Sequence, residues 1–460
     1  MLRYKFHLLL VILSSVIVGY YYYPSLNNYF IWDDYWFLMT SSGNVQSVVF
    51  GSPTLRLTGN VIMWLNYVAL GWNHVGYNVV SIAVHFVNII ILFICLKKIT
   101  DDEKLSFIVS ILYAAMSVYC DAILYKAALL TLTNLTFYLV ALLLYVKGKE
   151  NSKFYYWSLV VFFIGMFNKE EIASLPILIF FMELVLYDNF KNIKQVIKKT
   201  ATYGMIVVVY VSASLILTKL NFFYMEQFER LSKFRPLHSL SGGFTSFFAN
   251  PDGFLDNRYT LIRWLILLAV IPVALYCNRN RKMFLFGLGW IFITFLPQSY
   301  SSTTQYSPKY FFASISRHLY IPSVGAAIVV AVILLFTFKA AHRNKVNVAV
   351  AAFLCLLLFY NAPQVHERSR QWGDRRDADE MRIFLATLKA YYPVLDDGAH
   401  IIVDNPPTGR AYMTRALSAF YQRDVFFVDD PSTLDISKVS SLYEVNNYLH
   451  FGFLKAKRIK

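Results

Sequence analysis

The sequence predicts an all-α polytopic membrane protein with about eleven transmembrane helices, followed by a small C-terminal α/β domain. Of its 460 residues, 57% are hydrophobic and only 15% are charged. Soluble domains average about 45–50% apolar and about 25% charged residues. A soluble chain of this composition would need a very large core under very little polar cover, so we exclude that class.

Apolar runs of about 15–22 residues, long enough to cross a bilayer, recur through most of the chain. The first run is followed by Tyr-Tyr-Tyr-Tyr-Pro rather than by small residues, so we expect an uncleaved span and not a signal peptide. We expect spans at residues 6–22, 76–96, 105–120, 127–146, 154–168, 171–187, 201–218, 259–277, 283–297, 318–338 and 346–361.

The basic residues are spread over short loops between the apolar runs, although the formal net charge is +15. A nucleic-acid-binding protein would gather such charges in one patch, so we expect no nucleic-acid partner. Every second loop is short and basic, at residues 97–104, 147–153, 191–199, 279–282 and 339–345. Such loops face the cytoplasm, which predicts a cytoplasmic N-terminus and an external C-terminus. For so compact a chain we expect the inner membrane of a bacterium.

Three longer segments fall on the predicted outer side, at residues 23–75, at residues 219–258 and in the tail. We therefore divide the chain into a transmembrane domain, residues 1–361, and an external domain, residues 362–460. The external domain opens with a charged stretch that we expect to be a helix leaving the membrane. Strand-like runs at residues 401–403 and 425–428 then flank a helical stretch, which predicts a small α/β domain.

The strongest local signal for chemistry is the acidic pair Asp33 and Asp34, which directly follows the first span. Partial desolvation by the flanking aromatic rings and mutual repulsion raise the proton affinity of one carboxylate. Such a carboxylate suits a general base that takes a proton from a hydroxyl group. The alternative is that both acids only solvate the loop where the chain leaves the bilayer.

Two further charged groups fall on the same side. Asp121 ends the third span and Lys126 follows it; charges at membrane depth usually face a bundle interior or a cavity, although these two could simply pair. The segment Asn168–Glu171 stands at the turn between the fifth and sixth spans. We expect Lys169 to hold a phosphate and Glu170 or its neighbour to orient it, and the alternative is a charged cap on a short hairpin.

A basic segment, Ser316–Gly325, enters the tenth span from the predicted outer side. Arg317 stands at a helix start, where the helix dipole prefers an anion. Its position is understandable if a phosphate lies nearby, because guanidinium binds phosphate in bidentate fashion. The alternative is an interfacial arginine that extends to lipid headgroups. His318 and Tyr320 follow it, and Arg56 in the first outer segment is a further basic candidate.

Four blocks in this order resemble the GT-C superfamily of membrane glycosyltransferases, especially the O-mannosyltransferases with transmembrane and tetratricopeptide segments and the PMT-like families. The resemblance covers residues 20–335. The blocks are the pair Asp33-Asp34, the stretch Arg56–His85, the segment Asn168–Asp188, and the segment Arg317–Gly325, which is similar to the family's Arg-Tyr-Leu-Tyr-x-Pro-Ser-x-Gly.

The sequence also departs from the family pattern. Leu57 stands where the family has a proline after its arginine, and Asp121 takes the place of the glutamate in its His-Pro-x-His-x-Glu segment. The tetratricopeptide repeats are absent. The class of acceptor is therefore not carried over.

The resemblance implies an enzyme that transfers a sugar, with inversion, from a polyprenyl-phosphate carrier to an acceptor hydroxyl of a glycan, lipid or protein. The carrier's tail would lie among the spans and membrane lipids. Asp33 or Asp34 would be the base, and Arg317 and Lys169 would neutralise the leaving phosphate. The remaining predicted binding residues are Arg56, Asp121, Lys126, Glu170, His318 and Tyr320.

No organic cofactor is expected from the sequence. Asp33, Asp34 and Asp121 could together hold Mg²⁺ or Mn²⁺, because both ions prefer oxygen ligands. Some relatives use a metal and others do not. We expect the reaction to need none.

Three other functions remain open. A transporter or lipid-sugar flippase would have a site at the bilayer midplane and an internal repeat, whereas the ionisable residues here gather at the outer interface. An oligosaccharide ligase or polymerase of another fold would rely on Arg and His in a large late outer loop. A non-catalytic scaffold would bind the substrates without turnover.

Overall fold

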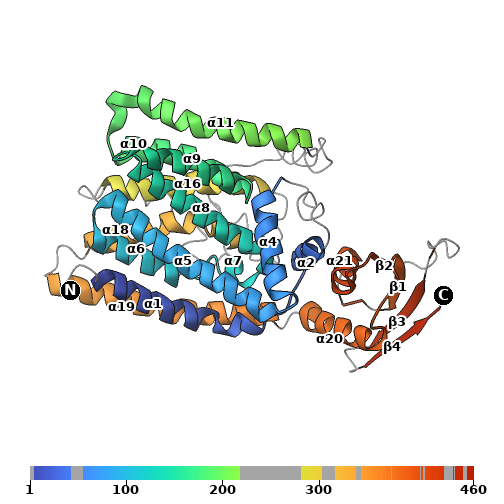
Figure 1. Cartoon of the computed structure of the whole chain (residues 1–460). Helices are drawn as coiled ribbons and strands as arrows, with labels where there is room; N and C mark the ends of the chain where they lie inside the picture. The colour runs from blue at the N-terminus through green and yellow to red at the C-terminus, as the bar shows by residue number, and fades with distance from the viewer. Residues whose placement is uncertain are drawn as a thin grey trace, which may run out of the picture.

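The computed structural model describes residues 5–42, 55–217, 281–302, 316–337, 343–373, 376–404, 406–407, 410–428, 439, 441–448 and 453–459. The helices of the N-terminal part lie side by side, and the C-terminal sheet stands beyond one end of them (Figure 1). The first half of this helical part consists of α1 (Lys5–Tyr22), η2 (Tyr23–Asn27), α2 (Asp33–Ser42), α4 (Leu57–Leu70), α5 (His74–Thr100), α6 (Glu103–Ala115), α7 (Asp121–Leu124), η3 (Lys126–Ala128) and α8 (Leu129–Lys147).

The second half of the helical part continues the bundle and ends in a long helix. It consists of α9 (Ser152–Met166), η4 (Glu170–Ser174), α10 (Leu175–Val185), η5 (Asn189–Asn192), α11 (Ile193–Leu217), α16 (Arg281–Ser302), η9 (Ser316–Leu319), α18 (Pro322–Thr337) and α19 (Arg343–Gly373).

By length and composition, four helical stretches of the described residues can cross a bilayer, at Phe6–Asn27, His74–Thr100, Lys126–Lys147 and Asn189–Ser214. The protein is therefore an integral membrane protein. A helix overlaps each predicted span except residues 259–277, although α6 ends at Ala115, before the end of the predicted span 105–120. That span and the second outer segment, residues 219–258, lie outside the described residues.

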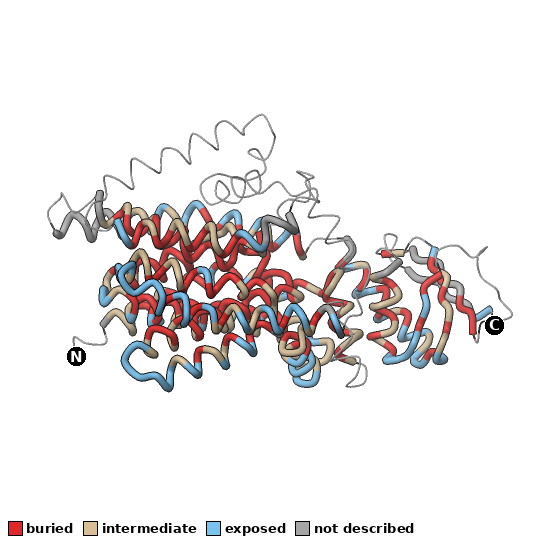
Figure 2. The backbone as a smooth tube through the Cα atoms, turned by 90° about the horizontal axis from the view of Figure 1, so that it is seen from above, coloured by how far each residue is buried: buried red, intermediate tan, exposed pale blue. Residues whose placement is uncertain are grey.

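Buried residues run along the inner faces of the helices (Figure 2). Helices α16 and α18 approach backbone to backbone, because a Cβ atom added at Gly325 would lie 2.5 Å from the carbonyl oxygen of Gly287 and 2.8 Å from the amide nitrogen of Ile291. Small residues allow such close packing between membrane helices. The contact fixes α18 and the turn η9 that precedes it.

The first outer segment folds into two helices, α2 and α4. Helix α4 runs across the ends of the bundle helices on the side of the C-terminal sheet (Figure 1). Val61, Trp64, Leu65 and Val68 expose an apolar stripe along it, with spacing typical of an amphipathic helix. This stripe suits contact with lipid at the membrane surface.

Helix α19 continues without a break through the predicted domain boundary at residues 361–362 and leads into the C-terminal part. This part consists of α20 (Arg376–Tyr391), β1 (Ala399–Asp404), α21 (Arg410–Tyr421), β2 (Val425–Val428), β3 (Leu442–Tyr448) and β4 (Phe453–Arg458). The strand order is β2-β1-β3-β4. Strand β1 is parallel to β2 and β3, and β4 is antiparallel to β3.

Candidate active site

Ion pairs between short connections mark one end of the helical part. Lys97 pairs with Glu103 at 2.8 Å and Lys98 with Glu150 at 2.6 Å, which joins the turns that follow α5 and α8. The predicted site residues lie at the opposite ends of these helices, where α1 leads towards α2, α6 towards α7 and α9 towards η4. That end faces the C-terminal sheet (Figure 1).

Asp34 is held inside the protein by backbone amides. It is 2% exposed, and its two carboxylate oxygens accept the N–H groups of Ile31 at 3.0 Å and Ala127 at 2.7 Å. Burial raises the pKa of Asp34 to about 6, against the lowering effects of Lys126 and the two amides. Asp34 therefore ties the turn before α2 to η3.

Lys126 anchors the same turn from the other side. Its ammonium group donates to the carbonyl oxygens of Asn28 at 2.8 Å and Tyr29 at 3.0 Å, and lies 5.4 Å from the ring centre of Phe30. A small cavity beside it is lined by Phe30, Asp34, Phe37, Leu38, Ser41, Met63, Tyr77 and Lys126. The alternative that Lys126 pairs with Asp121 is wrong, because its hydrogen bonds go to backbone carbonyls.

Asp33 and Arg317 meet at one tyrosine. Asp33 begins α2 and is half-buried, and an acid at a helix N-terminus is stabilised by the helix dipole. Its backbone N–H donates to the hydroxyl oxygen of Tyr125 at 3.1 Å. The guanidinium carbon of Arg317 lies 5.5 Å from the centre of the same ring. An acid from the start of the chain and a cation from η9 are thus within reach of one side chain.

The residue before Asp33 adopts a strained conformation. Trp32 has a φ of 46°, in the left-handed region that costs a non-glycine residue about 1–3 kcal/mol. Its ring meets that of Trp372 edge to face at 5.9 Å, and Trp372 stacks on Tyr125 at 5.3 Å. Aromatic contacts with α19 therefore hold the turn that places Asp33.

Asp121 is fully buried and is bound by α19. Two nitrogens of Arg368 donate to its two carboxylate oxygens, both at 2.9 Å, and the indole N–H of Trp372 donates at 2.6 Å. Bidentate guanidinium–carboxylate pairs are strong and directional. Asp121 thus joins α7 to α19, and its partner comes from the charged stretch of the tail.

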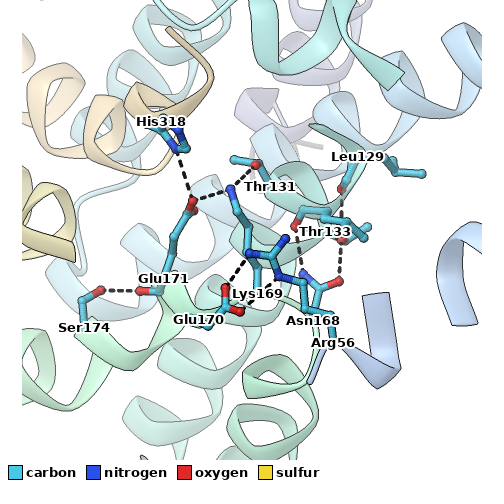
Figure 3. Close-up of polar contacts among 11 residues, drawn as sticks. Arg56, Leu129, Thr131, Thr133, Asn168, Lys169, Glu170, Glu171, Ser174 and His318 are labelled. Atoms are coloured by element: carbon cyan, nitrogen blue, oxygen red, sulfur yellow. Dashed lines mark hydrogen bonds and ion pairs between the residues drawn. The ribbon is translucent and has the colours of Figure 1, made fainter. Parts of the chain in front are cut away.

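A second polar network surrounds the turn after α9 (Figure 3). Arg56 donates two hydrogen bonds to the carboxylate of Glu170, at 3.1 and 2.9 Å. Burial would raise the pKa of Glu170, but Arg56 outweighs this effect and the pKa is lowered. A Cβ atom at Gly59 would lie 2.9 Å from the carbonyl oxygen of Asn168. Glycine therefore allows the start of α4 to pack onto this turn.

Lys169 and Glu171 form an ion pair within the same network (Figure 3). Lys169 also donates to the hydroxyl of Thr131 at 2.7 Å, and Nδ1 of His318 lies 3.5 Å from a carboxylate oxygen of Glu171. Burial lowers the pKa of Lys169, against the raising effect of Glu171. Arg317 thus lies near Tyr125 and its neighbour His318 lies near Glu171, so the two adjacent residues contact the two polar groups separately.

Tyr320 lies in the interior of the bundle and is 0% exposed. Its hydroxyl accepts the amide of Asn88 at 3.1 Å and lies 2.8 Å from Nδ1 of His85. These contacts pack the start of α18 against α5. We therefore correct its predicted role from substrate binding to packing.

The described residues contain no group of three His, Cys, Asp or Glu side chains that could hold a metal. Two of the three aspartates considered for Mg²⁺ or Mn²⁺ are engaged in other contacts. Both oxygens of Asp34 accept amides, and both oxygens of Asp121 accept Arg368. The carboxylate of Asp33 is instead close to the hydroxyl group of Tyr125.

Sequence analysis missed Tyr125, Arg368 and Trp372. Arg368 and Trp372 are four residues apart, so they share one face of a helix. That spacing is a usable signal within the charged stretch for which the sequence predicts a helix leaving the membrane. Tyr125 lies in the chain between the predicted site residues Asp121 and Lys126, but a tyrosine at this position is not by itself a signal for chemistry.

The chain is similar to known proteins both in sequence and in structure. No family model matches the chain. Over 150 residues, or 32% of the chain, it is 29% identical to the protein O-mannosyl-transferase F38B6.6 of Caenorhabditis elegans, and the match spans only 20% of that relative. The crystal structure of ArnT from Cupriavidus metallidurans bound to undecaprenyl phosphate is similar with a TM-score of 0.53 at 11% sequence identity, covering 98% of this chain and 94% of that one.

A further similar structure is the oligosaccharyltransferase of Archaeoglobus fulgidus, with a TM-score of 0.49 at 12% identity, covering 94% of this chain and 64% of that one. The likeness to ArnT extends over nearly the whole of both chains. The chain therefore has the fold of the GT-C membrane glycosyltransferases, and the sequence resemblance to this superfamily is confirmed at the level of the fold.

Proposed function

We propose that the protein is a membrane glycosyltransferase that moves a sugar from a polyprenyl-phosphate carrier to an acceptor hydroxyl, with inversion. The observation that carries this proposal is the meeting of Asp33 and Arg317 at Tyr125. The GT-C fold supports it, as does the undecaprenyl phosphate bound in the similar ArnT structure. The acceptor would be a hydroxyl of a glycan, a lipid or a protein.

Asp33 is the general base in this proposal. Both oxygens of Asp34 accept backbone amides, so moving that carboxylate to a substrate would break two hydrogen bonds. Asp33 is only half-buried and begins a helix. It takes the proton of the acceptor hydroxyl as the acceptor oxygen bonds to the anomeric carbon. The bond from that carbon to the phosphate oxygen breaks at the same time, and the carrier leaves as a polyprenyl phosphate.

Arg317 neutralises the charge that develops on the leaving phosphate. The other cations of the site are already paired: Arg56 with Glu170, Lys169 with Glu171 and Arg368 with Asp121. Within the described part of the chain, Arg317 forms no ion pair. Lys126 has no carboxylate in an ion pair either, but its ammonium group is buried and donates to the carbonyl oxygens of Asn28 and Tyr29. Arg317 can therefore receive a phosphate without giving up a carboxylate or a backbone contact, while Lys169 and His318 shape the adjoining wall.

We propose that the reaction takes place on the outer face of the membrane, in a bacterial inner membrane, without a divalent metal. The basic turns at the opposite end of the bundle support this orientation, because such turns face the cytoplasm. The engaged carboxylates of Asp34 and Asp121 support metal-independent transfer. The tail of the carrier would lie against the lipid-facing side of the bundle near α4.

The test uses the full chain in lipid nanodiscs with a panel of polyprenyl-phosphate-linked monosaccharides and a membrane glycolipid extract as acceptor. Released polyprenyl phosphate is measured by mass spectrometry. Asp33→Asn should lower release by about 10²–10⁴-fold, while Asp101→Asn, the same change at an exposed turn at the other end of the bundle, should leave it unchanged.

Three results would refute the proposal or its base assignment. The base assignment is wrong if Asp33→Asn releases polyprenyl phosphate as fast as the unchanged protein. A protein that binds the donors and moves them across the bilayer without cleaving the sugar–phosphate bond is instead a transporter or flippase. Binding without either event would indicate a scaffold.

A further inference from the structure

Helix α21 of the C-terminal part lies against α2, the helix that begins with Asp33 (Figure 1). Leu38 of α2 and Met413 of α21 belong to one buried apolar cluster. Phe420 of α21 also meets Trp72 edge to face at 5.1 Å. The C-terminal part is therefore packed onto the segment that holds the proposed base, and α21 is the element nearest to it.

Tyr412 and Arg415 stand one turn apart on α21. The guanidinium carbon of Arg415 lies 5.8 Å from the ring centre of Tyr412, and both residues are half-buried, so each keeps some exposed surface. Burial raises the pKa of Tyr412, Asp33 raises it further, and Arg415 and Arg317 lower it. The hydroxyl of Tyr412 therefore lies in the electrostatic field of Asp33, the proposed base, and of Arg317, the proposed phosphate ligand. Among the described residues, no carboxylate forms an ion pair with Arg415.

We propose that Tyr412 and Arg415 form the acceptor side of the site and select an acceptor sugar that carries a negative charge. This inference rests on the proposed function, in which Asp33 takes the proton of the acceptor hydroxyl. A tyrosine ring offers a large apolar face with a polar tip, which suits a sugar ring. A guanidinium group binds a carboxylate or a phosphate through paired hydrogen bonds. A sugar bound between them would lie beside Asp33.

The chemistry of the two residues also assigns them to the acceptor and not to the donor. The donor needs a cation at its phosphate next to the membrane bundle, and Arg317 on η9 supplies it. Arg415 is carried by α21 of the C-terminal part, and this helix lies on the far side of α2 from the bundle (Figure 1). Arg415 therefore offers a second cation, away from the donor phosphate, and we assign it to an anionic group of the acceptor.

The test measures the binding of three soluble probes, glucose, glucuronic acid and glucose 6-phosphate, to the full chain in nanodiscs by calorimetry. Both charged sugars should bind at least about tenfold more tightly than glucose. Arg415→Ala should remove that advantage, Tyr412→Ala should weaken all three sugars, and Tyr412→Phe should keep the ring contact. Arg423→Ala is the matched control, because it removes an exposed arginine just beyond the other end of α21.

Binding of undecaprenyl phosphate, measured by native mass spectrometry, serves as the donor-side readout and should be the same in all these variants. Equal binding of charged and neutral sugars, or equal behaviour of Arg415→Ala and Arg423→Ala, overturns the inference while donor binding leaves the proposed function standing. If the unchanged protein binds no undecaprenyl phosphate, the proposed function falls and the inference falls with it. A preference between the carboxylate and the phosphate tells which acidic sugar the acceptor carries.

Discussion

Replacing Arg368 with methionine removes the cation that neutralises the buried Asp121 carboxylate. Asp121 is 0% exposed, and Arg368 gives it two hydrogen bonds of 2.9 Å. Methionine keeps much of the apolar volume, and among the described residues it leaves the carboxylate only the indole N–H of Trp372. Removing one partner of a buried ion pair costs about 3–5 kcal/mol, because the remaining charge is left uncompensated. We expect Arg368→Met to lower the free energy of unfolding by that amount.

The assay is equilibrium unfolding of the purified full chain in mixed micelles with increasing SDS, followed by tryptophan fluorescence. Arg370→Met is the matched control, because Arg370 is exposed and its pair with Glu367 is a surface pair worth about 0–1 kcal/mol. Adding Asp121→Asn to Arg368→Met should recover stability, since the charge is then gone. The reasoning is refuted if Arg368→Met costs no more than Arg370→Met, or if the double variant is no more stable than Arg368→Met alone.

Three further predictions concern pH, packing and metal. Burial raises the pKa of Asp34 from 3.8 to about 6, so the stability contributed by its protonated form is full below its ordinary pKa and is lost as the pH rises through about 6. The melting temperature of the unchanged protein should therefore fall relative to Asp34→Asn between about pH 4 and pH 6; parallel curves would contradict this. Gly325→Leu should separate α16 from α18 and cost about 1–3 kcal/mol in the same SDS titration, whereas Gly19→Leu, where a Cβ atom meets nothing within 4 Å, should cost little. EDTA should leave sugar transfer within about twofold of its original rate, and a loss restored by Mg²⁺ would show that a metal is needed.

The fold could be predicted from the sequence wherever apolar length alone decides the structure. Runs such as residues 76–96 are long enough to cross a bilayer and become helices, here α5. Composition could not show that α4 lies across the bundle, because residues 57–70 are as apolar as a short span. Its direction depends on tertiary contacts such as the close approach of Gly59 to Asn168.

For the site, the sequence marked the residue types but not their pairing. Asp121 and Lys126 are near in the chain and opposite in charge, and this suggested a pair. The structure instead gives Asp121 a partner 247 residues away. A long-range partner of this kind leaves no local pattern, because the choice depends on which helices pack together. The bidentate contact of Arg56 with Glu170 is hidden in the same way.

The two adjacent aspartates show how one helix start can give the same residue type two different tasks. Successive residues at a helix start point about 100° apart, so Asp34 turns inward while Asp33 does not. The inward carboxylate can be buried only because the amides of Ile31 and Ala127 replace its lost water. In return, those bonds fix the backbone from which Asp33 projects. Replacing Asp34 should therefore slow the reaction indirectly, because it changes the position of Asp33. A variant whose side chain still accepts both amides should keep Asp33 in place.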